Sequence, residues 1–248
     1  MNRGRRWLVV AASAALLAGA WWWHDDRATR FLPPVDSAFV TRFAMPPAAD
    51  SAQTRRELDE LLALQASRSS ADVAAAQADR KTEITRFYGA LGLDPRQHEF
   101  PRVEKLAQRV ENDVRIYVRA VKDHFRRLRP YEIEPRLDPC IENVKGDLSY
   151  PSGHAAFAWA MAEVLADLVP EKRSALEARA AEFARQRMVC GVHFPSDLAA
   201  GKQAAEWVMQ GVRANMEYSI EAAEASVKLR EELGLPLQRP AGTPQKRS

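Results

Sequence analysis

The sequence predicts an all-α fold, a single helical-bundle domain of about six or seven helices with its active site formed at helix ends. Apolar residues after Pro101 recur every three or four positions, which is the period of a helix with one buried face. Sustained period-two alternation, the pattern of a half-buried strand, is absent from the sequence. About 180 residues of helical pattern are enough for one domain with a sizeable core.

The N-terminus predicts export. A basic start and a short apolar core end in the Ala-Gly-Ala of residues 18–20, which is typical of a secretory signal peptide over residues 1–20. The alternative is a single retained membrane anchor that extends to about residue 23 through three tryptophans. We therefore expect the protein to lie outside the cytoplasm, either periplasmic or secreted, or anchored to the inner membrane. Residues 21–50 contain two Pro-Pro pairs and predict a Pro-rich linker or arm.

Residues 51–234 are expected to form the helical domain. Its helical patterns cover about 51–66, 70–91, 103–128, 154–169, 171–187 and 195–233, the last in one or two pieces. Gly92 is the expected stop of the second segment. The third segment has a core-facing stripe, made of Val103, Leu106, Val110, Val114, Tyr117, Val121, Phe125 and Leu128. Residues 235–248 form a polar tail that we expect to be disordered.

Three fixed cations are the first feature of a candidate site. Lys122 and Arg129 are separated by two helical turns, so both are expected on one face of one helix. Because Arg129 precedes Pro130, it should lie near the end of that helix. Arg187 adds a planar fork that can hold two oxygens of a phosphate group.

The string Pro-Ser-Gly-His at residues 151–154 directly precedes a strong helix-forming run. Unpaired backbone N–H groups at a helix N-terminus attract anions. Gly153 would allow the backbone to approach a phosphate closely, and the Ser152 hydroxyl can donate a hydrogen bond to it. This segment therefore predicts a phosphate-binding helix end.

His193 and Asp197 predict a nucleophile with its orienting carboxylate. Pro195 suits the first position of a helix, which puts His193 just before that helix and Asp197 in its first turn. Asp197 would hold one ring nitrogen while the other faces phosphorus. His154 has no carboxylate nearby in sequence and would protonate the leaving oxygen. From chemistry alone, the roles of the two histidines could be reversed.

Each segment alone has an ordinary structural explanation, such as a solvated helix face, a turn or a surface ion pair. Together and in this order, they resemble the tripartite motif of the type 2 phosphatidic acid phosphatase superfamily, which also contains vanadium haloperoxidases. The chain looks most like the bacterial class A nonspecific acid phosphatases. In one departure, Gln186 stands where the family usually has Ser before the arginine.

The resemblance implies an all-helical domain, a phosphohistidine intermediate and no metal or other cofactor. Carried over residue by residue, Lys122, Arg129, Ser152, Gly153 and Arg187 would bind phosphate, with His193 as nucleophile, Asp197 as its partner and His154 as general acid. It also favours a homo-oligomer. The other histidines, His24, His98 and His124, form no metal-ligand spacing.

The two cysteines, Cys140 and Cys190, agree with export, because an oxidising compartment permits a disulfide between them. Two buried free thiols are the alternative. The formal net charge is +3, and no basic patch with interleaved aromatic residues indicates nucleic-acid binding.

We therefore expect an exported acid phosphatase that hydrolyses small phosphomonoesters and releases inorganic phosphate. The alternatives are a membrane-associated lipid-phosphate phosphatase and a non-catalytic periplasmic phosphate-binding module.

Overall fold

The computed structural model describes residues 28–141 and 147–237. All regular structure within these ranges is helical, so the predicted all-α class is confirmed. Seven helices have nine residues or more: α2 (Ala52–Ser67), α3 (Ser70–Ala78), α5 (Pro101–Phe125), α7 (Gly153–Leu168), α8 (Arg173–Val189), α9 (Pro195–Arg213) and α10 (Met216–Glu232). Three helices have four residues: α1 (Ser37–Val40), α4 (Tyr88–Leu91) and α6 (Pro130–Ile133).

The N-terminal signal peptide or anchor, residues 1–20 or to about 23, and most of the C-terminal tail lie outside the described residues. Among the helices that are described, none is both long and apolar enough to cross a membrane.

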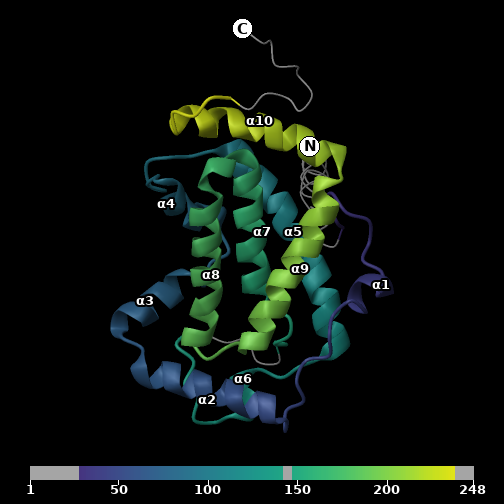
Figure 1. Ribbon diagram of the computed structural model, residues 1–248, viewed down its shortest axis with the longest axis vertical. Helices are drawn as coiled ribbons and strands as arrows, with labels where there is room; N and C mark the ends of the chain where they lie inside the picture. The colour runs from purple at the N-terminus through teal and green to yellow at the C-terminus, as the bar shows by residue number, and fades with distance from the viewer. Residues whose placement is uncertain (1–27, 142–146, 238–248) are drawn as a thin grey trace, which may run out of the picture.

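Helix α7 is the centre of the bundle. It packs against α5, α8, α9 and α10, and 11 of its 16 residues are buried. Its many alanines explain this position, because small side chains let neighbouring helices approach from several sides. Helix α8 returns antiparallel beside α7, and α9 follows on the other side (Figure 1).

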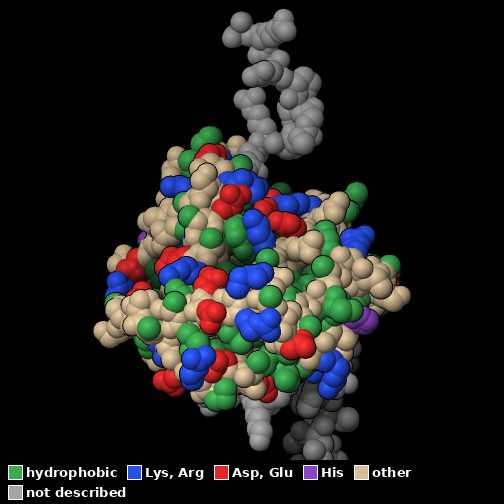
Figure 2. Space-filling model, turned by 60° about the horizontal axis from the view of Figure 1, so that its bottom comes forward, with side chains coloured by type: hydrophobic (Ala, Val, Ile, Leu, Met, Phe, Trp, Pro, Cys, Tyr) green, Lys and Arg blue, Asp and Glu red, His purple; other side chains and the backbone are tan. Residues whose placement is uncertain are grey.

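The two ends of the bundle are covered differently. Helix α10 lies across one end, while α2 and α6 lie across the other (Figure 1). This second end receives the C-termini of α5 and α8 and the N-termini of α7 and α9. The three sequence segments singled out above therefore meet there. Acidic and basic side chains are interspersed over the face at this end (Figure 2).

The N-terminal arm packs along α5 and α9. The buried Asp113 carboxylate accepts hydrogen bonds from three successive backbone N–H groups, those of Arg30, Phe31 and Leu32. Further along, the ring of Phe39 contacts Tyr117 and Trp207 edge to face. These contacts hold residues 30–43 against the bundle.

Two helix predictions were wrong. Helix α5 ends at Phe125, so Arg129 does not lie on the same helix as Lys122. The helix ends because Arg126 adopts a left-handed conformation, with φ 52°, and the following residues turn back toward the bundle. Leu128, predicted as part of the core stripe, is 51% exposed as a result.

The expected helix over 70–91 is interrupted. Helix α3 ends at Ala78, and a 3₁₀ turn (Ile84–Phe87) and α4 follow before Gly92, which is left-handed at φ 88°. The break occurs where the buried carboxylate of Asp79 receives Arg86 and Arg179 at 2.8 and 2.6 Å. Asp79 is the C-cap of α3, and its two ion pairs hold the chain where the helix ends.

Candidate active site

A cavity of about 370 Å³ opens at the end of the bundle where these helix termini meet. Six of the predicted site residues line it: Lys122, Arg129, Gly153, His154, Arg187 and His193. Four further lining residues, Arg80, Tyr131, Ile141 and Asp147, come from the surrounding loops and α6. Helices α5 and α8, the loop after α5 and the segment after α3 thus supply positive charge to one small volume.

Ser152 and Asp197 lie behind the cavity wall. Both are fully buried. The Ser152 hydroxyl accepts a hydrogen bond from the N–H of Ala155 and so caps α7, while its own backbone N–H donates to the Asp197 carbonyl at 2.9 Å. The hydroxyl proton of Ser152 is still available for donation. These contacts join the first turn of α7 to the first turn of α9.

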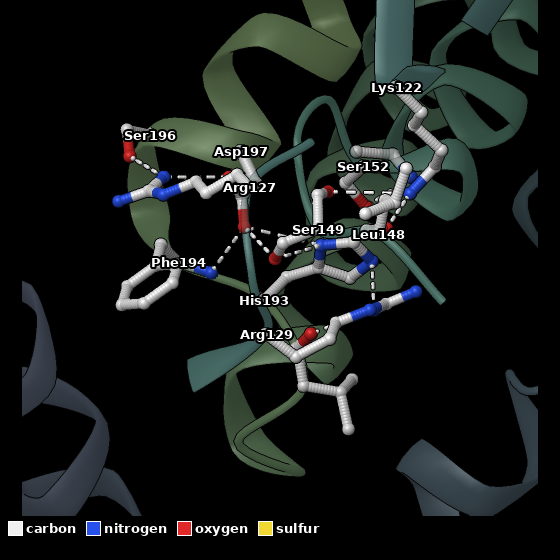
Figure 3. A network of polar contacts seen from close by, with 12 residues as sticks. Lys122, Arg127, Arg129, Leu148, Ser149, Ser152, His193, Phe194, Ser196 and Asp197 are labelled. Atoms are coloured by element: carbon white, nitrogen blue, oxygen red, sulfur yellow. Dashed lines mark hydrogen bonds and ion pairs between the residues drawn. The ribbon is translucent and has the colours of Figure 1, made fainter. Parts of the chain in front are cut away.

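The two ring nitrogens of His193 have different partners (Figure 3). A guanidinium N–H of Arg129 points at Nε2 from 2.7 Å. Because a guanidinium only donates, Nε2 must present its lone pair, and the neutral ring carries its proton on Nδ1. Nδ1 lies 3.4 Å from Oδ2 of Asp197. The nitrogen that presents its lone pair, here to Arg129, is therefore the one that faces the cationic cavity.

Asp197 is the third residue of α9, as its spacing predicted, and its carboxylate has several partners. Oδ2 accepts from the Ser149 hydroxyl at 2.5 Å and from the N–H of Phe194 at 2.9 Å. Oδ1 accepts from Arg127 at 2.7 Å. Its bond to His193 is thus the longest of the four, and the carboxylate is fixed mainly by the other three.

His154 has an orienting group that its sequence neighbourhood does not contain. Its Nε2 lies 3.0 Å from the backbone carbonyl oxygen of Arg80, in the segment after α3. A carbonyl only accepts, so Nε2 carries a proton and Nδ1 is the nitrogen left for chemistry. The Arg80 carbonyl holds His154 as Asp197 holds His193.

The cavity crowds positive charge out of water. Burial, and then the charge of Arg129, lower the pKa of Lys122 to about 7 and that of Arg187 to about 9. Burial, and then Arg187, lower the pKa of His154 to about 3. The pKa of His193 is also well below its ordinary value, first because of burial and then because of Arg129. Burial raises the pKa of Asp197.

Hydrogen bonding at the cavity is incomplete. Arg129 forms an ion pair with Asp147, and Lys122 donates to the Leu148 carbonyl. By contrast, Nε of Arg187 is buried without a hydrogen-bond partner, as is Oε1 of the adjacent Gln186. A buried donor without a partner is costly, and a bound anion with several acceptor oxygens would satisfy it.

Cys140 and Cys190 form a disulfide, with Cα atoms 4.7 Å apart. Cys190 caps the C-terminus of α8, three residues after Arg187. The bond therefore joins the helix that carries Arg187 to the segment that leads into the cavity wall at Ile141.

Several residues of the site were not predicted. Arg127, Ser149 and Asp147 contact the predicted residues directly, and Arg80 contributes a backbone carbonyl. Arg127 stands two residues before Arg129, and Ser149 stands three before Ser152, so proximity to the motifs was their only signal. The Arg80 carbonyl has no sequence signal at all, since any residue type supplies one.

Within the described residues, no three His, Cys, Asp or Glu side chains cluster as ligands of one ion. Arginine and lysine, which do not ligate metals when charged, dominate the cavity.

Comparison with known proteins supports the resemblance over the segment that carries the motifs. The sequence profile of the PAP2 superfamily matches residues 114–213, the segment that carries all three motifs. The expected resemblance to this superfamily is confirmed over that segment of the chain. Its relatives include a non-specific acid phosphatase of Providencia stuartii, 28% identical over 143 residues, which are 56% of this chain and 58% of that protein.

Two further relatives are shorter matches. A non-specific acid phosphatase of Salmonella typhi is 37% identical over 86 residues, 34% of each chain. An acid phosphatase of Zymomonas mobilis is 30% identical over 116 residues, 45% of this chain and 44% of that one. This chain thus spans 34–58% of the length of these three relatives.

Among solved structures, a transmembrane PAP2 type phosphatidylglycerolphosphate phosphatase from Bacillus subtilis superposes with a TM-score of 0.48 at 16% identity. The match covers 71% of this chain and 90% of that one.

Proposed function

We propose that the protein is an exported acid phosphatase that hydrolyses small, water-soluble phosphomonoesters through a phosphohistidine intermediate on His193, without a metal ion. The observation that carries the proposal is the cavity itself. Lys122, Arg129 and Arg187 converge on it while buried, and Arg187 has an unsatisfied N–H. A bound phosphate dianion would compensate their charge and supply the missing acceptors.

The first step is transfer of the phosphoryl group to His193. The Nε2 lone pair attacks phosphorus, a P–N bond forms, and the bond from phosphorus to the ester oxygen breaks. The three cations stabilise the charge on the equatorial oxygens, which is the main catalytic requirement of phosphoryl transfer. As Nε2 becomes bonded, the ring acquires positive charge, and Asp197 stabilises it through Nδ1–H.

Protonated His154 gives its Nδ1 proton to the leaving alkoxide, while Nε2–H keeps its hydrogen bond to the Arg80 carbonyl. In the second step, neutral His154 takes a proton from water, whose oxygen attacks phosphorus. The P–N bond breaks, inorganic phosphate leaves, and both histidines return to their starting states. Two histidines in different environments thus divide the two roles.

Two observations support export. The disulfide fits an oxidising compartment, and the sequence of the N-terminal segment fits a signal peptide or anchor.

Hydrolysis of p-nitrophenyl phosphate by the full-length protein at pH 6, with EDTA, tests the proposal. We expect turnover that persists in EDTA and falls by at least about a thousandfold in His193→Ala, because the nucleophile is lost. His98→Ala is the matched control, since His98 lies away from the cavity beside Glu232.

Turnover retained by His193→Ala, or abolished by EDTA, would contradict the mechanism. Phosphate binding without turnover would instead indicate the non-catalytic binding module. Turnover confined to phosphatidate in vesicles would indicate the lipid-phosphate phosphatase.

A further inference from the structure

Arg127 is a buried arginine that belongs to none of the predicted site residues and does not line the cavity. It follows the end of α5 and is 7% exposed. One guanidinium nitrogen donates to Oδ1 of Asp197 and to the Ser196 hydroxyl, both at 2.7 Å. The other donates to Glu57 at 3.1 Å. Its guanidinium also stacks over the ring of Phe194, 3.9 Å from the centroid.

Glu57 binds the second guanidinium nitrogen of Arg127. Its carboxylate lies on α2, is 7% exposed and also accepts from Ser196 at 2.9 Å. Glu57 lies outside residues 114–213, which match the superfamily profile. The chain Glu57, Arg127, Asp197 and His193 therefore links the helix that covers the site to the proposed nucleophile.

The contacts divide the two oxygens of Asp197. Oδ1 is taken by Arg127, so Oδ2 is left to Ser149, the N–H of Phe194 and Nδ1 of His193 (Figure 3). The backbone carbonyl of Arg127 also accepts from the N–H of Ser149 at 2.8 Å. Arg127 thus positions both Asp197 and the serine that binds it.

We propose that Arg127 is a positioning residue that keeps Asp197 ionised and its Oδ2 directed at His193, so that His193 Nε2 is free to attack phosphorus. The inference deepens the proposed function and rests on it.

The charge balance explains why such a residue is needed. Burial raises the pKa of Asp197, and Arg127 is the strongest influence in the opposite direction. Without that charge, the buried Asp197–His193 pair would retain a proton to higher pH. The additional proton slows attack in either position: on His193 it removes the Nε2 lone pair, and on Asp197 it removes the negative charge that stabilises the ring as the P–N bond forms.

Other charges face this pair from the neighbouring elements. His193 is surrounded by Lys122 on α5, Arg129 in the loop after it, His154 on α7 and Arg187 on α8, with Asp147 beside Arg129. These groups also line the phosphate cavity, whereas Arg127 does not. Its replacement is therefore expected to change the protonation of the pair and leave ester binding largely intact.

The test compares Arg127→Gln and Arg127→Lys with the wild-type protein, as kcat and KM for p-nitrophenyl phosphate against pH. In Arg127→Gln, the acidic limb of the kcat/KM profile should move to higher pH by about one to three units. The KM at the pH optimum should remain within about threefold of wild type. Arg127→Lys, which retains a charge but cannot bridge Asp197 and Glu57, should show a smaller shift in the same direction.

The matched control is Arg230→Gln. Arg230 is also a buried arginine, paired with Glu171 at 2.7 Å, at the opposite end of the bundle. Its loss should lower thermal stability without moving the acidic limb. An unchanged profile in the Arg127 variants, or an equal loss of rate at every pH, would overturn the inference. If Arg127→Gln does not fold, the profile of Arg127→Lys decides by the same criteria.

A second readout separates this inference from the proposed function. ¹⁵N NMR titration of the His193 ring, assigned by its absence in His193→Gln, should show the same upward shift in Arg127→Gln. A shifted titration in a protein without turnover would refute the phosphatase proposal and leave the role of Arg127 standing. An unshifted titration would refute the role of Arg127.

Discussion

At the scale of single residues, the site is organised around charge that its own carboxylates do not balance. Lys122, with a pKa near 7, and His154, with a pKa near 3, both hold their protons less tightly than usual because burial and neighbouring cations disfavour the charged forms. A bound dianion counteracts the effect of the neighbouring cations and so raises both pKa values. The site is therefore expected to gain protons when an anion enters it.

Sulfate is a suitable probe, because it is a tetrahedral dianion that does not itself titrate near neutral pH. At pH 6, Lys122 is already largely protonated, so uptake should come from His154. At pH 8, uptake should come from Lys122. Calorimetric titration in buffers of different ionisation enthalpy measures the protons bound. We expect His154→Asn to remove the proton uptake at pH 6 and Lys122→Met to remove the proton uptake at pH 8. Sulfate binding without proton uptake at both pH values would contradict this account.

How far the sequence predicts these residues depends on where the partner of each side chain lies. His193 and Asp197 are four positions apart at a helix start, and local spacing was enough to pair them. His154 and Arg80 are 74 positions apart and are joined through a backbone carbonyl, which leaves no pattern of residue types. Glu57 and Arg127 are separated by 70 positions, and only the packing of α2 over the site brings them together.

At the scale of helices, periodicity predicted where helices lie better than where they end. The apolar stripe of α5 runs through Leu128 in sequence, but the helix stops at Phe125 because Arg126, a non-glycine residue, is left-handed. Arginine rarely adopts this conformation, so the residue type did not predict the end of the helix. By contrast, Gly92 and Pro195 marked a helix end and a helix start by their own backbone preferences.

The close contact of α7 and α9 requires glycine at position 201. A Cβ atom there would lie 2.6 Å from the Ser152 carbonyl oxygen and 2.8 Å from Cβ of Ala155. Gly201→Ala should therefore cost about 1–3 kcal/mol of stability. It should also lower kcat, because α9 carries Asp197 and α7 carries His154.

Denaturant unfolding and turnover measure these two effects. Gly89→Ala is the control, since a Cβ at that helical position meets no atom within 4 Å. It should be neutral or slightly stabilising, given the helix propensity of alanine. Equal stability of the Gly201→Ala and wild-type proteins would show that α9 shifts without cost, contrary to the expectation.

At the scale of the whole molecule, the fold confines its chemistry to one end. The opposite end is closed by α10, whose buried Arg230 pairs with Glu171, whereas the site end is assembled from helix termini and loops (Figure 1). Helix termini supply directed N–H groups, and loops supply side chains that reach inward. Such an end needs additional restraint, because loops lack the internal hydrogen bonds of helices.

The disulfide supplies part of that restraint, and its removal should affect stability and the site together. Cys140 and Cys190 are 50 positions apart, and closing a loop of that length is worth about 4 kcal/mol, mainly by restricting the unfolded chain. Reduction should lower the free energy of unfolding by about this amount. It should also weaken phosphate binding, because Cys190 closely follows Arg187 and Cys140 precedes Ile141 in the cavity wall.

Denaturant unfolding and phosphate titration, each with and without dithiothreitol, measure both effects. The control is the double variant Cys140→Ala/Cys190→Ala, which the reductant should leave unchanged. If dithiothreitol leaves the wild-type protein unchanged although thiol titration shows two free cysteines, the bond does not restrain this end, and the packing of α2 and α6 alone holds the site together.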